Sequence, residues 1–186
     1  MIKFIDYPVI LFGMIQKNQK FAPLGCCIAN KEDKDTYTKI CEFVSNNVLN
    51  PPKLVMADGD KSISGAVKDV WPSAVRINCF FHIKQCLKRD PNYLSLKKSK
   101  EEKANTEDMI SDIGLIQTHA VNEENFLKLV NLFKEKWLKF YESKSDNIKA
   151  KVEGFLQYVM SLATNYTWGM FANPGHSLTN NALGKH

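Results

Sequence analysis

The sequence predicts an α/β fold followed by a helical part, and two features of the chain support this. In the first half, apolar runs of strand length alternate with segments whose apolar residues recur at helical spacing. In the second half, longer helical stripes replace the strand-length runs. The chain has 186 residues, 44% of them hydrophobic, which is enough to bury one sizeable core.

Two neighbouring strands are expected near the start of the chain. Tyr7–Ile15 is almost continuously apolar, which predicts a strand buried on both faces. The polar residues 16–20 predict a hairpin turn, and Phe21–Ala29 is predicted to be the second strand, where Pro23 suits an edge position. A polar loop follows, in which Asp33 can cap a helix.

A helix and a strand are expected next. Apolar residues at helical spacing predict a helix that Pro51 and Pro52 end. These apolar residues are Tyr37, Ile40, Cys41, Val44 and Val48. Leu54–Ala57 then predicts a further strand.

A second helix and a fourth strand complete the α/β pattern. The helix can be capped by Asp60 or Ser62 and stops at Pro72. Its apolar face is made of Ile63, Ala66, Val67 and Val70. Ala74–Phe81 predicts another strand, and Ile83–Arg89 predicts a short helix.

After Arg89 the pattern becomes helical. Lys97–Lys103 is a charged stretch, predicted to be a solvated loop or helix face. Two stripes at helical spacing then predict buried helices, with aromatic residues that serve as core and not as a cofactor site. The first stripe is Phe126, Val130, Phe133, Trp137 and Phe140, and the second is Val152, Phe155, Leu156, Val159 and Ala163.

Composition limits the possible compartments and partners. The net charge of +5 permits a polyanionic partner without requiring one. The number of cysteines is odd, at five, and no secretory signal opens the chain, so we expect reduced thiols in a nuclear or other intracellular protein that is not secreted. No apolar run reaches membrane-spanning length, so no membrane partner is expected.

Asp58 is the first candidate for chemistry, because Leu54–Ala57 is followed by two acidic residues, Asp58 and Asp60. Ligand sites in open α/β sheets lie beyond the carboxyl ends of strands, where a carboxylate can bind a divalent metal. Phosphoryl transfer with two metals needs two or three such acids. From the residues alone, Asp58 is either a metal ligand or part of a helix cap, and Asp60 is expected to be the cap.

Cys79 and His82 are the second candidate, because their spacing is that of half a zinc site. A complete site needs four ligands, and the remaining candidates are scattered: Cys86, His119, His176 and His186. The alternative is a structural role, with a buried thiol and a hydrogen-bonded imidazole near the end of a strand. The chain has no dinucleotide, phosphate-loop, serine-hydrolase or zinc-protease motif.

These segments, in this order, resemble the MULE (Mutator-like element) transposase domain. Tyr7–Tyr37 resembles that family's second and third strands, Leu54–Pro72 its segment with the second acidic residue, and Arg76–His82 its Cys-x-x-His signature. Ser95–Ala163 resembles the helical insertion of the family. Trp168 and Ser177–Leu183 resemble its Thr-Asn-Asn block.

The resemblance implies a fold and a chemistry. The fold is an RNase H-like mixed sheet flanked by helices, and the activity is DNA transposition through metal-dependent DNA cleavage and strand transfer. By position, Asp58 corresponds to the second catalytic, metal-binding carboxylate, and Cys79 and His82 to the signature pair. The implied cofactor is Mg²⁺ or Mn²⁺, the implied partner is transposon-end DNA, and the full-length protein can oligomerise.

Two departures from the family pattern leave the enzymatic activity open. The family's first catalytic Asp precedes the position of Tyr7 by about one strand, and Asp6 is too close to Tyr7 to replace it. Met1–Asp6 is expected to be too short for a full first strand and its turn, so the second strand would pair with Leu54–Asp58 or lack a partner. Gly184 occupies the position of the final Glu.

We therefore expect a transposase fragment that retains one of three acids and is inactive as a nuclease. The alternative is a non-catalytic DNA- or protein-binding module, supported by the basic residues Lys84, Lys88, Arg89, Lys97, Lys98 and Lys100. A small zinc module built on Cys79 and His82 is a third possibility. The predicted organisation is an RNase H-like core in residues 1–90, a helical insertion in 91–165 and a C-terminal Thr-Asn-Asn segment in 166–186.

Overall fold

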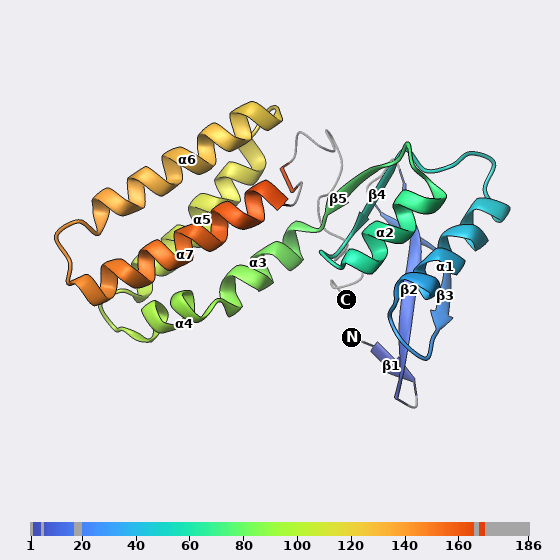
Figure 1. The fold of residues 1–186 in the computed structure, drawn as a ribbon, viewed down its shortest axis with the longest axis horizontal. Helices are drawn as coiled ribbons and strands as arrows, with labels where there is room; N and C mark the ends of the chain where they lie inside the picture. The colour runs from blue at the N-terminus through green and yellow to red at the C-terminus, as the bar shows by residue number, and fades with distance from the viewer. Residues whose placement is uncertain (1, 5, 17–19, 166–167, 170–186) are drawn as a thin grey trace. The chain divides into compact units, whose positions relative to one another are not determined.

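The computed structural model describes residues 2–4, 6–16, 20–165 and 168–169. The chain contacts divide it into two compact units, with the boundary between Ile77 and Asn78. We call the unit that ends at Ile77 the N-terminal unit and the unit that starts at Asn78 the helical unit (Figure 1). The fold is α/β, as the sequence predicts.

The N-terminal unit begins with a three-stranded antiparallel sheet. Its strands are β1 (Ile2–Phe4), β2 (Tyr7–Ile15) and β3 (Phe21–Ile28), in the order β1-β2-β3. The backbone N–H of Gln16 donates to the carbonyl of Lys20 (2.9 Å), which closes the hairpin. The predicted strands are thus confirmed, and Pro23 lies in an edge strand as expected.

A β-bulge interrupts the β2–β3 ladder between Phe12 and Gly13. A side chain at Gly13 would collide with the carbonyl of Ala22 and with the ring of Phe21, so only glycine fits this close approach.

Met1–Asp6 was expected to be too short for a full first strand and its turn, so that β2 would pair with Leu54–Asp58 or lack a partner; this pairing prediction is wrong, because a three-residue strand forms there. β1 pairs with β2 through Ile2–Val9, Lys3–Pro8 and Phe4–Tyr7. A tight turn makes this possible, and in it Asp6 adopts a left-handed conformation (φ 66°), which aspartate tolerates better than most residues. Three residues are therefore enough for a short edge strand.

The rest of the N-terminal unit pairs two helices and two strands. α1 (Lys34–Asn47) packs on α2 (Lys61–Val70), while β4 (Leu54–Ala57) and β5 (Val75–Asn78) form a two-stranded sheet. The buried centre of this region consists of Cys41, Ala66, Val67 and Trp71. Trp71 Nε1 donates to Ser45 Oγ (2.6 Å) and links the end of α2 to α1.

Asp33 caps α1 as predicted, since its carboxylate accepts the N–H of Thr36 (2.9 Å). This bond and the nearby Lys31 ammonium lower the pKa of Asp33 to about 2, with the Lys31 contact the larger cause.

Two predictions about the sheet are not met in the described residues. The sequence predicts one mixed sheet, but the described strands form two separate sheets, because β1 pairs with β2 while β4 pairs with β5. The prediction that β2 is buried on both faces is also wrong. Tyr7, Leu11 and Met14 are exposed, and Phe12 makes an edge-to-face ring contact with Phe43 of α1 (6.0 Å).

In its described residues, the helical unit contains five helices in succession (Figure 1). They are α3 (Phe80–Arg89), α4 (Pro91–Lys98), α5 (Lys103–His119), α6 (Glu123–Phe140) and α7 (Asp146–Asn165). Asp90 separates α3 from α4 and caps α4 by accepting the N–H groups of Asn92 (2.9 Å) and Tyr93 (3.0 Å). Asn122 caps α6 in the same way, through the N–H of Asn125 (2.7 Å).

The predicted stripes form the core of the helical unit, with one exception. Both predicted helices are present, and their stripe residues are buried apart from Phe140, which is exposed. Trp168 adds to this core: its ring stacks on Phe80 (5.5 Å) and meets Phe126 edge to face (4.7 Å). Trp168 Nε1 donates to the carbonyl of Leu162 (3.3 Å), so the end of α7 is held to the start of α3 and to α6.

A buried carboxylate also stabilises the helical unit. Glu102 has no exposed surface, accepts from Asn105 Nδ2 (3.0 Å) and pairs with Lys144 Nζ (3.0 Å). Burial alone would raise the pKa of Glu102, but these partners outweigh it and hold the pKa below its usual value. The pair joins the start of α5 to the loop between α6 and α7.

Candidate functional site

Asp58 lies directly after β4, as the sequence predicts. Its side chain is half-buried, and Asp58 Oδ1 accepts the backbone N–H of Asp60 (3.1 Å). This short-range bond fixes the turn between β4 and α2 and uses one of the two carboxylate oxygens.

Asp60 is the cap of α2, as predicted. Its Oδ1 accepts the N–H of Ser62 (2.6 Å), and its carbonyl accepts from the N–H of Ser64 (3.2 Å). Because Asp60 satisfies the helix N-terminus, Asp58 is not needed for that role. The two acids after β4 therefore have different structural tasks.

The pKa of Tyr37 in α1 is affected by the acidic residues of this turn. Burial raises the pKa of the Tyr37 hydroxyl, and the carboxylates of Glu32, Asp58 and Asp60 raise it further. The carboxylates of Glu32, Asp58 and Asp60 thus lie near enough to Tyr37 to act on its hydroxyl.

Arg76 of β5 is a positioning residue that the sequence analysis missed. Its guanidinium donates to the carbonyls of Asp58 and Ile77, and more weakly to that of Ala57 (3.5 Å). These bonds hold the end of β4 against β5. An arginine between the apolar residues Val75 and Ile77 of a strand was the available signal, because a charge at such a position needs partners.

Cys79 and His82 lie at the start of α3 and not at the end of a strand. The sequence predicts a strand as far as Phe81, but β5 ends at Asn78 and Cys79 is the N-cap residue of α3. The helix starts earlier because Phe80, Ile83 and Leu87 share one buried face. Cys79 is fully buried, whereas His82 is half-buried and its Nδ1 is buried without a hydrogen-bond partner.

One of the two residues between them, Phe80, ties this motif to the helical core. Phe80 follows Cys79 and stacks on Trp168, so the Cys-x-x-His segment is part of the packing of the helical unit. Asp58 belongs to the N-terminal unit, while Cys79 and His82 belong to the helical unit.

The residues present meet one requirement for a divalent metal. Asp58 offers a hard oxygen ligand, which suits Mg²⁺ or Mn²⁺. Within the described ranges, no group of three His, Cys, Asp or Glu side chains converges on one point. A complete metal-binding set is therefore not assembled by those residues, and neither is the four-ligand zinc site.

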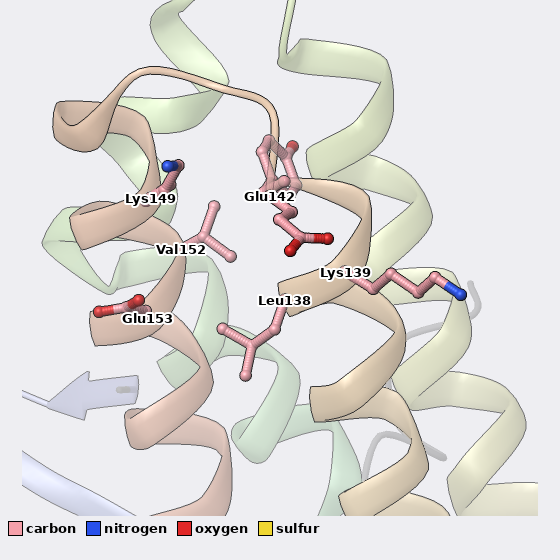
Figure 2. A pocket seen from close by; sticks show the side chains of 7 residues that line it. Leu138, Lys139, Glu142, Lys149, Val152 and Glu153 are labelled. Atoms are coloured by element: carbon pink, nitrogen blue, oxygen red, sulfur yellow. The ribbon is translucent and has the colours of Figure 1, made fainter.

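The hollows of the surface lie elsewhere. Figure 2 shows a cavity of about 440 Å³ between the end of α6 and the start of α7, where Glu142 of the loop after α6 and Lys149 of α7 flank Val152. A second hollow of about 500 Å³, between α5 and α6, is mostly apolar. Neither is lined by Asp58, Cys79 or His82, so neither identifies the chemistry.

Three further expectations concern the cysteines, membrane-spanning helices and the Thr-Asn-Asn block. All five cysteines lie in the described part of the chain, and none forms a disulfide bond. No helix among the described residues is both long and apolar enough to cross a membrane. The segment Ser177–Leu183 and Gly184 lie outside the described residues.

The architecture and the site define an α/β domain with an acidic turn after β4 and a Cys-x-x-His motif at the start of α3. The model of one protein family, the MULE transposase domain, matches residues 3–86. Residues 3–86, a little less than half of the chain, are thus similar to the MULE transposase domain. The match contains Asp58, Cys79 and His82, and ends before most of the helical unit. No curated protein matches the chain.

Proposed function

We propose that this chain is a transposase-type domain that acts on DNA, with Asp58 as one of its metal-binding carboxylates. The observation that carries the proposal is the family match over residues 3–86, within which Asp58 follows β4. The core is proposed to be RNase H-like, with the helical unit as its insertion. The proposed organisation is an RNase H-like core in residues 1–90, a helical insertion in 91–165 and a C-terminal segment in 166–186.

The local structure supports the role of Asp58. The helix cap is supplied by Asp60, so Asp58 retains a carboxylate oxygen for a ligand. Arg76 binds the carbonyl of Asp58 and that of Ile77 in β5, which would hold the main chain that carries the carboxylate in place. A bound Mg²⁺ or Mn²⁺ supplies Lewis-acid stabilisation of phosphate oxygens in such enzymes.

The test of this role is Mn²⁺ binding, measured by the electron paramagnetic resonance signal of the free ion. Wild-type protein is expected to bind Mn²⁺, and Asp58→Asn is expected to weaken the binding. Asp69→Asn is the matched control, since Asp69 is an exposed acid of the same unit that pairs with Lys34 (2.7 Å). Equal effects of the two substitutions, or none from Asp58→Asn, would reject the role.

We also propose that the 186-residue chain alone does not cleave DNA. Of the three acids in the family pattern, this chain is expected to retain one, Asp58. One carboxylate cannot hold the two metal ions that phosphoryl transfer needs. The measurement is cleavage of end-labelled transposon-type DNA with Mn²⁺. Cleavage by the wild-type chain that Asp58→Ala abolishes would show that the chain is an active nuclease.

The second candidate function is a non-catalytic DNA-binding module. The observation that favours it is the concentration of basic side chains in α3 and α4. Because basic side chains bind phosphates without a metal ion, this function does not require metal binding by Asp58.

A further inference from the structure

The positive charge of the chain is concentrated in one segment, residues 80–100, which we call the cationic arm. The arm holds six Lys and Arg side chains and a single acid, Asp90, so its net charge equals the +5 of the whole chain. Acidic and basic side chains balance in the remainder. Such a segregation of charge is the electrostatic footprint of a surface for a polyanion.

The arm has a defined shape. It consists of α3, α4 and the two residues that follow, and α3 packs on α4 while both helices contact α7. In Figure 1, α3 and α4 follow one another along one edge of the helical unit, and α6 lies at the opposite edge. The buried sides of the two helices are apolar, made of Phe80, Ile83, Leu87, Tyr93 and Leu96.

The basic side chains lie on the outer side of the arm. Lys88, Arg89, Lys98 and Lys100 are exposed, and within the described part of the chain none of them forms an ion pair. Asp90 carries the one negative charge of the arm; its carboxylate accepts two main-chain N–H groups at the start of α4 and, among the described residues, forms no ion pair with these basic side chains.

The contrast with α6 shows that this arrangement is not general for the surface. On α6, Lys128 pairs with Glu124 (2.6 Å) and Lys136 pairs with Asp112 of α5 (2.6 Å). In the arm, Lys97 is the one basic side chain that pairs with an acid among the residues that the structure describes, Glu107 at 3.7 Å.

Two lysines of the arm are held in place by aromatic rings. Lys84 Nζ lies 5.8 Å from the ring centre of Phe80, and Lys97 Nζ lies 5.9 Å from that of Tyr93. Since both rings are buried and fixed, the lysine stems lie along them with the charged ends directed outward. Restricted side chains lose less entropy when they bind a phosphate.

We propose that the cationic arm binds the phosphate backbone of duplex DNA, independently of Asp58 and of metal. The choice of DNA as the polyanion rests on the proposed function. Lys84 and Lys88 lie one helical turn apart, and with Arg89 and Lys98 they give about four contacts, which corresponds to a salt slope of about −3.6. The arm makes no base contacts and confers no sequence preference.

The experiment measures binding of a fluorescent DNA duplex to the full chain by anisotropy, in EDTA, from about 50 to about 200 mM salt. Lys88→Gln combined with Arg89→Gln is expected to weaken binding about tenfold and to reduce the salt slope by about two. Lys128→Gln combined with Lys139→Gln, on α6, removes the same charge and is the matched control. A loss below threefold is expected for that control.

A native thiol gives a readout that needs no substitution. Cys86 is exposed in α3, one turn before Arg89, so bound DNA should slow its alkylation. Equal weakening by the two double variants would overturn the proposal, as would unchanged binding by the arm variant, or an alkylation rate that DNA does not change. Tighter binding of single-stranded RNA than of the duplex would also overturn it.

The failure of this proposal and the failure of the proposed function are distinguishable. Asp58→Asn should bind DNA in EDTA as the wild type does, because the arm does not use the metal site. Loss of Mn²⁺ binding without loss of DNA binding separates the two sites. If DNA binding depends on Asp58 but not on Lys88 and Arg89, the proposal for the cationic arm is rejected and the proposed function of Asp58 stands.

Discussion

The two units of this protein differ in two respects: how much of the family match each contains, and how many hydrophobic side chains each buries. The N-terminal unit holds nearly all of the family match and Asp58, yet only five hydrophobic residues before Asn78 are buried among those described: Cys41, Ala66, Val67, Trp71 and Ile77. The helical unit is matched only at its start but has a continuous apolar core along α3 to α7. The family match therefore covers the segment that contains Asp58, and not the helical unit, where most of the buried hydrophobic residues lie.

This difference predicts unequal stability. Burial of apolar surface is the main favourable contribution to folding, and it is concentrated in the helical unit. The sheet of β1, β2 and β3 exposes apolar side chains, including Tyr7, Leu11, Leu24 and Ile28. We expect the N-terminal unit to unfold first, and the substitutions below test each side of this comparison.

The largest effect is expected from Trp168→Ala, which removes the ring between Phe80 and Phe126. The cavity should reduce the free energy of unfolding of the helical unit by about 4 kcal/mol. Urea unfolding followed by helical circular dichroism measures this change. Leu132→Ala, at an exposed position of α6, is the control and should stay within about 0.5 kcal/mol. A small loss from Trp168→Ala would contradict the role of this ring in the core.

A smaller effect is expected from Lys144→Met, which leaves Glu102 buried without its cation. Breaking this pair from one side should lower the free energy of unfolding by more than the loss of a surface pair does, because the Glu102 carboxylate has no exposed surface. Lys149→Met is the control, because its partner Asp146 is fully exposed (3.5 Å pair). Equal stabilities of the two variants would show that the Glu102 pair is not important for the helical unit.

The same pair predicts the acid limb of the stability curve. The pKa of Glu102 is lower in the folded protein than its ordinary value of 4.5, so its contribution is complete above that pH and is lost as the pH falls towards the folded pKa. Glu102→Gln should therefore flatten the stability curve below about pH 4.5. An unchanged acid limb would contradict the lowered pKa.

Local signals in the sequence were sufficient for most single elements. β2 and β4 occur where predicted, since their apolar runs are bounded by polar turns and by Asp58. The caps at Asp33 and Asp60 were also predictable, because capping depends on a side chain and backbone N–H groups two or three residues away.

Pairing between distant elements was not predictable to the same degree. The single mixed sheet was inferred from the family resemblance, and the lack of a full first strand from the length of Met1–Asp6, where the turn at Asp6 allows a three-residue β1. The start of α3 at Phe80 depends on Trp168, which lies far along the chain. The Arg76 anchor likewise depends on carbonyl groups that only the folded β4 and β5 bring together.

In the N-terminal unit, Asp60→Ala should remove the cap of α2 and cost about 1 kcal/mol. With Trp137→Phe and Trp168→Phe in the background, the fluorescence of Trp71 reports this unit alone, because the protein has three tryptophans. Asp69→Ala, also in α2, removes an exposed pair with Lys34 and should cost less than about 0.5 kcal/mol. Equal losses would mean that charge, and not capping, explains the effect.

The smallest change in stability is expected at the exposed face of the sheet, where the effect appears instead in solubility. Exposed apolar side chains and a free strand edge favour association, so the wild-type chain should be poorly soluble when expressed alone. Leu11→Lys places a charge on the exposed face and should increase the soluble fraction while stability changes by less than about 0.5 kcal/mol. Phe12→Lys adds the same charge on the opposite face, where Phe12 contacts Phe43, and should destabilise the unit. A soluble, monomeric wild type with one cooperative thermal transition would contradict both the solubility prediction and the unequal stability of the two units.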